Sequence, residues 1–268
     1  MWKQSAKTVM RSVGLQRSQV AAARMAVERS TIATLPGLGP PRQRGRVLAY
    51  HSVAQPRTGV NDVSRRRFER QLDIAIALGF EFVTAQSIAD TGGTPKQLAI
   101  TVDDAWTSAA EFIAPILRKR DIPWSLFVVS GWSDHDDPWT RADILNWDDL
   151  KKLRGSDLEL GCHSQTHPDF STLTRSEITH ELEVCRAKMQ THLGITPKTF
   201  AIPYGQSMNW TAEAHELAQA AGFDTIYSQA EKTGFAGTIS RTFVTKFDND
   251  RIFRALLRGA FDKWEEWV

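Results

Sequence analysis

The chain has 268 residues, a length that suits one sizeable domain with or without an appendage. Apolar residues make up 41% of it and charged residues 24%, which predicts an ordinary globular core. The net charge is only +2 and no nucleic-acid-binding motif is recognised, so nucleic acid is excluded as a general partner.

The first 45 residues differ from the rest. They form a basic N-terminal segment, with no acidic residue before Glu28, and end in a Pro/Gly-rich linker over 34–45. Basic residues interrupt the apolar stretches, so no secretion signal is recognised, and no run approaches the ~18 apolar residues of a membrane span. We expect a solvated helix or tail, or a segment that resembles a transit peptide or contacts an anionic membrane peripherally. A cytoplasmic or peripheral-membrane location follows.

From residue 46 onwards, strand patterns alternate with helix patterns. We predict strands at residues 47–50, 80–83, 97–104, 122–129, 157–163, 198–205, 223–228 and 237–244. We predict helices at 64–79, 84–93, 107–120, 146–155, 173–194, 211–222 and 249–261. Pro115 demands a kink or a helix start nearby. The alternation predicts a mostly parallel sheet with helical crossovers, in about seven or eight β–α units, as an open sheet or a barrel.

Polar side chains follow several of these strands at the point where each ends. They are His51, the pair Asp103 and Asp104, His163, and Tyr204. In parallel α/β folds, active sites collect at the carboxyl ends of the strands. The sequence therefore predicts that these residues meet at one mouth.

Adjacent carboxylates in an extended strand point to opposite faces, but the chain bends where a strand ends. Asp103 and Asp104 can then serve one pocket in different roles, one binding a cation and the other acting as a base. The alternative is that Asp104 caps the helix that follows.

His163 and His167 lie four residues apart, a spacing that lets two imidazoles face one point. With one aspartate they make a two-histidine, one-carboxylate set that leaves positions open for water and substrate. Zinc suits such a set, and so do cobalt, nickel and iron. The alternative is two ordinary surface histidines, because this spacing alone is a weak motif.

Three short stretches, TVDDAW, HSQTH and AIPYG, occur in this order in the chain. They resemble the first three motifs of the polysaccharide deacetylases, which are the carbohydrate esterases of family 4, or NodB-homology domains. LAYHSV and NWDDL resemble that family too. The resemblance implies an α/β fold, a distorted (β/α)7–8 barrel of the NodB-homology type, with residues 46–268 as the catalytic domain. It also implies metal-dependent hydrolysis of N-acetyl groups on an amino-sugar polymer or glycoconjugate of the cell envelope, with release of acetate.

The resemblance assigns roles by position. Asp103 is the expected general base, and Asp104, His163 and His167 are the expected metal ligands. The backbone N–H of Tyr204 is expected to help hold the oxyanion. His51 is the expected general acid, because the branch that acts on poly-β-1,6-N-acetylglucosamine takes this histidine from an N-terminal Tyr-His.

Two positions depart from the family pattern. Ala105 stands where a glycine usually follows the aspartate pair, and Ala201 stands where an arginine usually steadies the base. We expect Arg241 to take the place of that arginine.

For other residues the sequence allows only less specific interpretations. Three tryptophans near the predicted mouth suit stacking on pyranose rings, or simply pack: Trp106, Trp132 and Trp139. Three polar residues of one loop are interpreted as solvated: His135, Asp136 and Asp137. Cys162 and Cys185 form no disulfide framework and are expected to be buried thiols.

Two other functions remain open. One is a hydrolase of the same fold that acts on a non-sugar amide or an O-acetyl ester. The other is a catalytically weak glycan-binding domain, which the intact aspartates and histidines disfavour. The basic N-terminal segment has no expected part in catalysis, so deletion of residues 1–40 should leave turnover of a small substrate intact.

Overall fold

The structure is a computed structural model that describes residues 17–34 and 43–264. Residues 1–16, about half of the basic segment before the linker, and residues 35–42 of the linker lie outside the described residues. None of the described helices is both long enough and apolar enough to cross a membrane.

One large sheet organises the described chain. Its nine strands are β1 (Arg46–Tyr50), β4 (Glu81–Phe82), β5 (Gln97–Val102), β6 (Trp124–Val128), β7 (Leu158–Cys162), β8 (Thr199–Ala201), β9 (Thr225–Ser228), β10 (Thr238–Ser240) and β11 (Thr242–Phe243). The strands pair in parallel, in the order β10-β9-β8-β7-β6-β5-β1-β11, and β4 pairs with β5. Two short strands, β2 (Ser52–Val53) and β3 (Asp62–Val63), pair separately.

The two ends of this path, β10 and β11, are separated in sequence by Arg241 alone. At Arg241 the chain therefore passes directly from one edge strand of the sheet to the other. This is possible because the sheet is curled and nearly closes into a barrel at that residue. The predicted distorted (β/α) barrel is confirmed.

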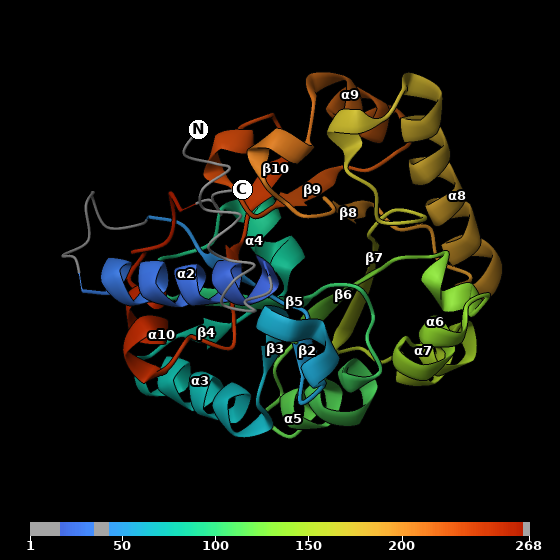
Figure 1. Ribbon diagram of the computed structural model, residues 1–268. Coiled ribbons are helices and arrows are strands. Elements are labelled where there is room, and N and C mark those ends of the chain that lie inside the picture. The colour runs from blue at the N-terminus through green and yellow to red at the C-terminus, as the bar shows by residue number, and fades with distance from the viewer. Residues whose placement is uncertain (1–16, 35–42, 265–268) are drawn as a thin grey trace.

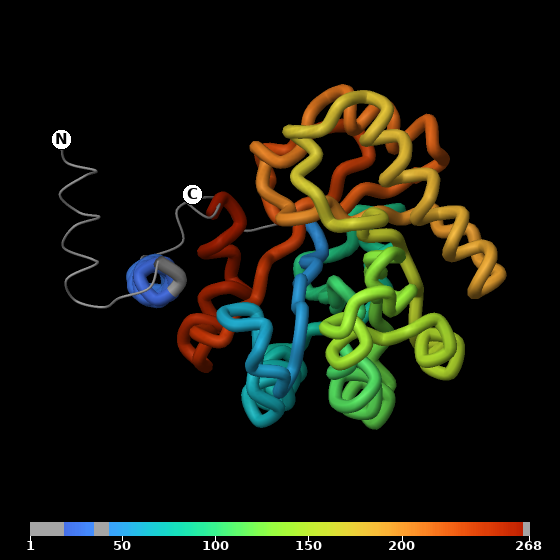
Figure 2. The backbone as a smooth tube through the Cα atoms, turned by 45° about the vertical axis from the view of Figure 1, so that its right-hand side comes forward, coloured from blue at the N-terminus to red at the C-terminus, as the bar shows by residue number. Residues whose placement is uncertain are grey.

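Helices surround the sheet in Figures 1 and 2. They are α2 (Arg17–Ile32), α3 (Arg65–Ala77), α4 (Ala85–Thr91), α5 (Ala114–Arg118), α6 (Pro138–Asp143), α7 (Trp147–Leu153), α8 (Arg175–Leu193), α9 (Ala212–Ala220) and α10 (Asp250–Leu257). Local sequence sets their ends: the Ser64 side chain accepts from Arg67 N, and Thr174 with Glu177 forms a capping box. Gly194, with φ +67°, ends α8 in the left-handed conformation that glycine favours.

Alternation along the strands divides the buried residues into two cores. The larger fills the space between sheet and helices and takes Leu48, Ile100 and Leu126, among others. The smaller lies inside the barrel and comprises Val47, Ala85, Ile88, Ala99, Phe127, Ala201 and Tyr227. Because side chains alternate with a period of two, Asp103 is in phase with Ala99 and points into the barrel.

One predicted strand needs correction, and the kink or helix start predicted near Pro115 is confirmed. Residues 237–244 are predicted as one strand, but they form two strands, β10 and β11, at opposite ends of the sheet path. The chain crosses at Arg241 the seam of the barrel, which is the gap between its first and last strands. The predicted helix at 107–120 begins as a π-helix over Ala109–Ile113 and becomes α-helical at Ala114, next to Pro115. Proline lacks the N–H of a regular turn, which explains the change.

Candidate active site

Asp103 and Arg241 form a buried ion pair inside the barrel. Arg241 Nη1 donates to Asp103 Oδ1 at 2.7 Å and Nη2 donates to Oδ2 at 2.9 Å, and both side chains are at most 1% exposed. The guanidinium also lies over the Phe127 ring, 5.3 Å from its centroid, and donates to Thr101 Oγ1. The expectation that Arg241 supports Asp103 in place of an arginine at Ala201 is confirmed.

The charge around Asp103 keeps it ionised. Burial alone would raise the pKa of this carboxyl. The charge and hydrogen bonds of Arg241, with smaller electrostatic contributions from His163 and His51, outweigh burial and lower the pKa from 3.8 to about 2. A carboxylate that stays charged at neutral pH suits a base.

Asp104 turns away from this pair and faces two histidines. Its Oδ1 lies 3.5 Å from His163 Nε2 and 3.7 Å from His167 Nε2. The ligand atoms of the three residues all lie within 4.8 Å of one another. Asp104 does not cap the following helix, and its other oxygen accepts from Trp106 Nε1 at 3.0 Å.

A divalent metal fits this cluster on two observations. Asp104 Oδ1 is buried without a hydrogen-bond partner among the described groups, although two imidazoles face it. His163 Nδ1 lies 2.7 Å from the Ala201 carbonyl oxygen, which can only accept, so Nδ1 carries the proton and Nε2 offers its lone pair towards Asp104. Burial also lowers the pKa of His163 to about 4, so the ring is neutral, as a ligand must be.

The backbone around these residues is unusual. Five of the eight non-glycine residues with positive φ in the described ranges lie in the three loops at this edge: Asp104, Ala105, Ser164, His167 and Tyr204. Left-handed conformations cost non-glycine residues about 1–2 kcal/mol each, and such strain gathers at functional sites. At Ala105 the φ of +60° explains why glycine is the usual residue there.

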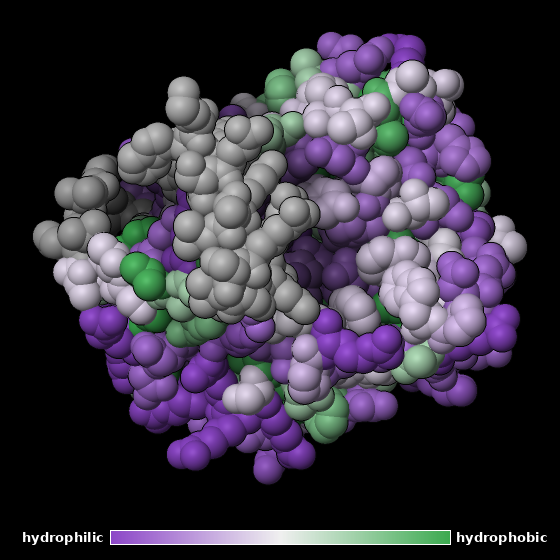
Figure 3. All heavy atoms as spheres, in the orientation of Figure 1, coloured by the Kyte–Doolittle hydropathy of each residue, from purple (hydrophilic) through white to green (hydrophobic). Residues whose placement is uncertain are grey.

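A cavity of about 440 Å³ opens onto the cluster. Its lining includes two of the expected ligands, two residues expected to act on substrate, and a ring of amides and other groups: Asp104, His167, His51, Tyr204, Asn61, Asp169, Gln206, Asn209, Gln229 and Phe243. Figure 3 shows a hollow lined by hydrophilic residues near the centre of the face it presents. Asp103 and His163 lie deeper and do not line the cavity.

His51 and Tyr204 border this cavity from two sides. His51 is 8% exposed, packs edge-on against Phe243 at 5.4 Å, and its Nδ1 has no hydrogen-bond partner among the described groups. Tyr204 is 53% exposed, and the centroid of its ring lies 4.8 Å from that of His167. Both residues therefore lie where the sequence predicts, at the same mouth as the histidine and aspartate cluster.

The three tryptophans form a ledge beside the ligands. Trp132 stacks on His167 at 5.4 Å, Trp139 contacts Trp132 at 5.1 Å, and Trp106 lies 6.4 Å from Trp139. Trp139 is 38% exposed, so the ledge has an open aromatic face.

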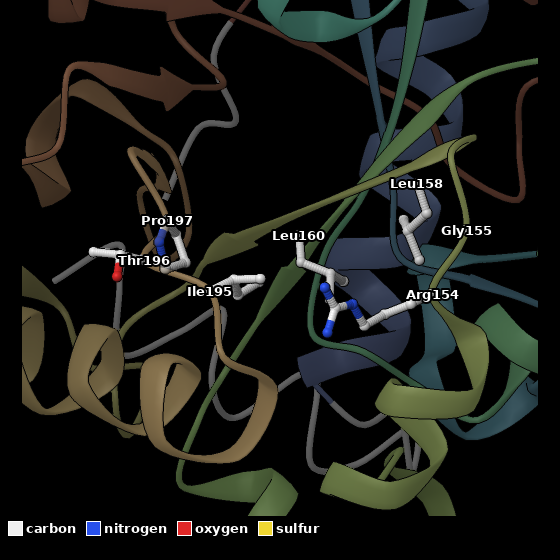
Figure 4. Close-up of a pocket in the computed structure, with 7 residues that line it drawn as sticks. All are labelled: Arg154, Gly155, Leu158, Leu160, Ile195, Thr196 and Pro197. Carbon is white, nitrogen blue, oxygen red and sulfur yellow. The ribbon is translucent and has the colours of Figure 1, made fainter.

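The remaining predicted side chains stay outside this cluster. His135 Nε2 lies 2.8 Å from the Ile144 carbonyl oxygen, and Asp136 and Asp137 are exposed. Cys162 and Cys185 are buried free thiols, as expected. A second cavity of about 500 Å³ lies near the start of β7 and before β8, around Arg154, Leu160 and Pro197 (Figure 4). It contains none of the residues assigned to the site.

Sequence reasoning missed Phe243, which contacts His51 and lines the cavity. No local pattern marks this residue, because β11 places it only when the barrel closes.

The chain was compared with protein-family models and with curated proteins, and it matches both. The model of a family described as polysaccharide deacetylase matches residues 90–226. The uncharacterized protein YlxY of Bacillus subtilis (strain 168) is 29% identical over 116 residues, 42% of this chain and 33% of that protein. The chain spans between a fifth and a third of the length of the curated relatives it matches.

Solved structures with the same fold cover most of the chain. The deacetylase PplD of Streptococcus pyogenes, in complex with acetate, superposes with a TM-score of 0.67 at 18% identity, over 81% of this chain and 98% of that one. IcaB from Ammonifex degensii gives 0.66 at 23% identity, over 81% and 97%. These likenesses establish the fold.

The family model spans about half of the chain and includes the segments that carry Asp103, Asp104, His163, His167 and Tyr204. His51 and Arg241 lie outside the matched range. His51 follows β1, and Arg241 lies between β10 and β11, where the barrel nearly closes. The chain belongs to the polysaccharide deacetylase family.

Proposed function

We propose that the protein is a metal-dependent deacetylase that hydrolyses N-acetyl groups on an amino-sugar polymer or glycoconjugate. One observation carries the proposal: a largely buried cluster of two histidines and one aspartate adjoins an arginine-held carboxylate at the base of an open cavity. The family description supports a polysaccharide substrate, and the tryptophan ledge offers an aromatic face for a sugar ring.

Asp104, His163 and His167 would hold the metal. Zinc is the first choice for this donor set, since it takes three protein ligands and leaves a position open. When bound, such an ion polarises an amide carbonyl and makes water acidic enough to ionise near neutral pH.

The protein groups around the ion supply the rest of the reaction. Asp103, ionised and fixed by Arg241, accepts the proton of the attacking water. The Tyr204 backbone N–H, for which none of the described residues provides an acceptor, donates to the developing oxyanion. His51 donates a proton to the departing nitrogen, because an amine leaves poorly as an anion.

The first test is acetate release from N-acetylglucosamine oligomers with β-1,4 or β-1,6 linkages, before and after removal of metal. We expect release that a chelator abolishes and zinc or cobalt restores, and the preferred linkage identifies the substrate. Metal binding without release from either series would favour a different acyl substrate, such as an O-acetyl ester. A protein that binds no metal would contradict the proposal.

The role of His51 predicts a difference between amide and ester substrates. We expect His51→Ala to keep its metal and to lose amide hydrolysis by about 10²–10⁴-fold, the usual contribution of a general acid. Hydrolysis of 4-nitrophenyl acetate should persist, because the nitrophenolate leaves without being protonated.

The control is His192→Ala, which removes a histidine that also packs on an aromatic ring, Trp147, but lies outside the cavity. It should leave both activities unchanged. Equal losses of amide and ester hydrolysis in His51→Ala would show that His51 is not the acid.

A further inference from the structure

An arginine of the N-terminal helix enters the core of the domain. Met25 and Arg29 of α2, and Ala33 just after it, lie on the face that packs against the domain, and Arg29 is 0% exposed. Figures 1 and 2 both place α2 beside the C-terminal part of the chain. A fully buried arginine requires a partner, because an unpaired buried charge is costly.

The partner is Asp248. Arg29 Nε and Nη2 donate to the two Asp248 oxygens at 2.5 and 2.6 Å, and neither side chain is exposed. The guanidinium lies 4.5 Å from the Phe261 ring centroid and 5.2 Å from that of Trp264. This planar, bidentate and stacked arrangement is one that lysine cannot reproduce.

The same guanidinium holds the strand that closes the barrel. Arg29 Nη2 also donates to the Phe243 carbonyl oxygen at 3.0 Å. Asp248 in turn accepts from the Thr245 backbone N–H at 2.9 Å and from the Thr245 hydroxyl. Arg29 therefore clamps the segment 243–248 at both ends, from outside the sheet.

This segment is continuous with the site. The residue before β11 is Arg241, which holds Asp103, and Phe243 packs against His51. A second connection runs through Gln71, which donates to the Asp248 carbonyl and accepts from the Tyr50 hydroxyl. Tyr50 immediately precedes His51, and Arg241 lies two residues before Phe243. The expected acid and the arginine that holds the expected base are therefore each one or two residues from a group that the Arg29 clamp holds.

We infer that Arg29 is a positioning residue for the proposed reaction, acting through β11 on Asp103 and His51, so that α2 belongs to the catalytic unit. The inference rests on the proposed function for its kinetic consequence. It also reverses the expectation that residues 1–40 are dispensable, because their deletion leaves Asp248 buried without its arginine and β11 without its clamp.

The test compares substitutions on the same helix in the full chain. Arg29→Met alone leaves a buried charge and can fail to fold, so the decisive variant is Arg29→Met with Asp248→Asn, which removes both charges and keeps an acceptor for Thr245. The matched control is Arg24→Met, which breaks an ion pair with Glu28 on the exposed side of α2. Arg29→Lys tests partial rescue.

Two readouts separate positioning from simple stabilisation. Amide hydrogen exchange of residues 241–249 reports the clamp without any need for activity. Acetate release, measured at a temperature where each variant is folded and metal-loaded, gives kcat and KM. We expect faster exchange and a kcat lower by ~10- to 100-fold with little change in KM for the double variant, the scale of a small misplacement of catalytic groups.

Arg24→Met should match the wild type in both readouts, and Arg29→Lys should recover part of kcat. A folded double variant with wild-type kcat, or with unchanged exchange in 241–249, would overturn the inference. If the wild type itself releases no acetate, the proposed function fails, and the inference is then decided by the exchange result alone.

Discussion

Replacement of Asp103 by asparagine is expected to abolish most turnover while the metal site stays intact. Asparagine has the shape of aspartate but cannot accept the proton of the attacking water. General bases contribute about 10²–10⁴-fold to rate, so kcat should fall by that factor at saturating substrate. The three proposed metal ligands should keep their contacts, because Asp103 Oδ2 lies 4.0 Å from His163 Nε2 and Asp103 is not itself in the cluster.

The matched control is Asp104→Asn, the same substitution one residue later. It removes a ligand from the cluster, so it should lose metal stoichiometry together with turnover. The measurement is metal content by mass spectrometry alongside acetate release. Asp103→Asn that turns over like the wild type would remove Asp103 as the base, and loss of metal in that variant would place it among the ligands.

The order and type of most elements could be predicted because the chain follows regular periods. Strands such as 97–102 are mostly apolar runs, and helices such as 175–193 begin at a capping box and end at a glycine. The break at Arg241 could not be predicted in this way. Residues 237–244 (GTISRTFV) are mostly apolar or β-branched around a single arginine. Only the closure of the barrel places that arginine between its first and last strands.

The site was predictable where the signal is local, and not where it depends on distant contacts. The Asp103–Asp104 pair and the spacing of His163 and His167 are readable in short stretches of sequence. Arg241 was predicted only as a substitute for an arginine missing at Ala201. Arg29 was not predicted at all, since its stretch resembles an ordinary surface helix and its partner is 219 residues away.

Arg241→Met is expected to move the pH dependence of both activity and stability. In the wild type the pKa of Asp103 is lowered to about 2, below its ordinary 3.8. The pair therefore stabilises the fold at pH values above 3.8, and this contribution is lost as the pH falls through about 2. Without Arg241, burial becomes the dominant influence, and the pKa of Asp103 rises instead.

The sign of the effect then reverses. The folded variant binds a proton more tightly than the unfolded chain, so its stability falls as the pH rises, whereas that of the wild type increases with pH in the acidic range. At neutral pH the unpaired buried carboxylate should cost about 3–5 kcal/mol of unfolding free energy. The acid limb of kcat/KM should shift to higher pH, because the base must be ionised.

Arg46→Met is the matched control, since Arg46 is also a buried arginine beside the seam. It pairs with Asp262 and donates to Thr242, at the opposite end of β1 from His51. Its loss should reduce stability without moving the acid limb of the pH–rate profile. If the acid limb of the pH–rate profile does not shift in Arg241→Met, ionisation of Asp103 does not determine that limb. Arg241 would then have a structural role in closing the barrel and no role in holding the base.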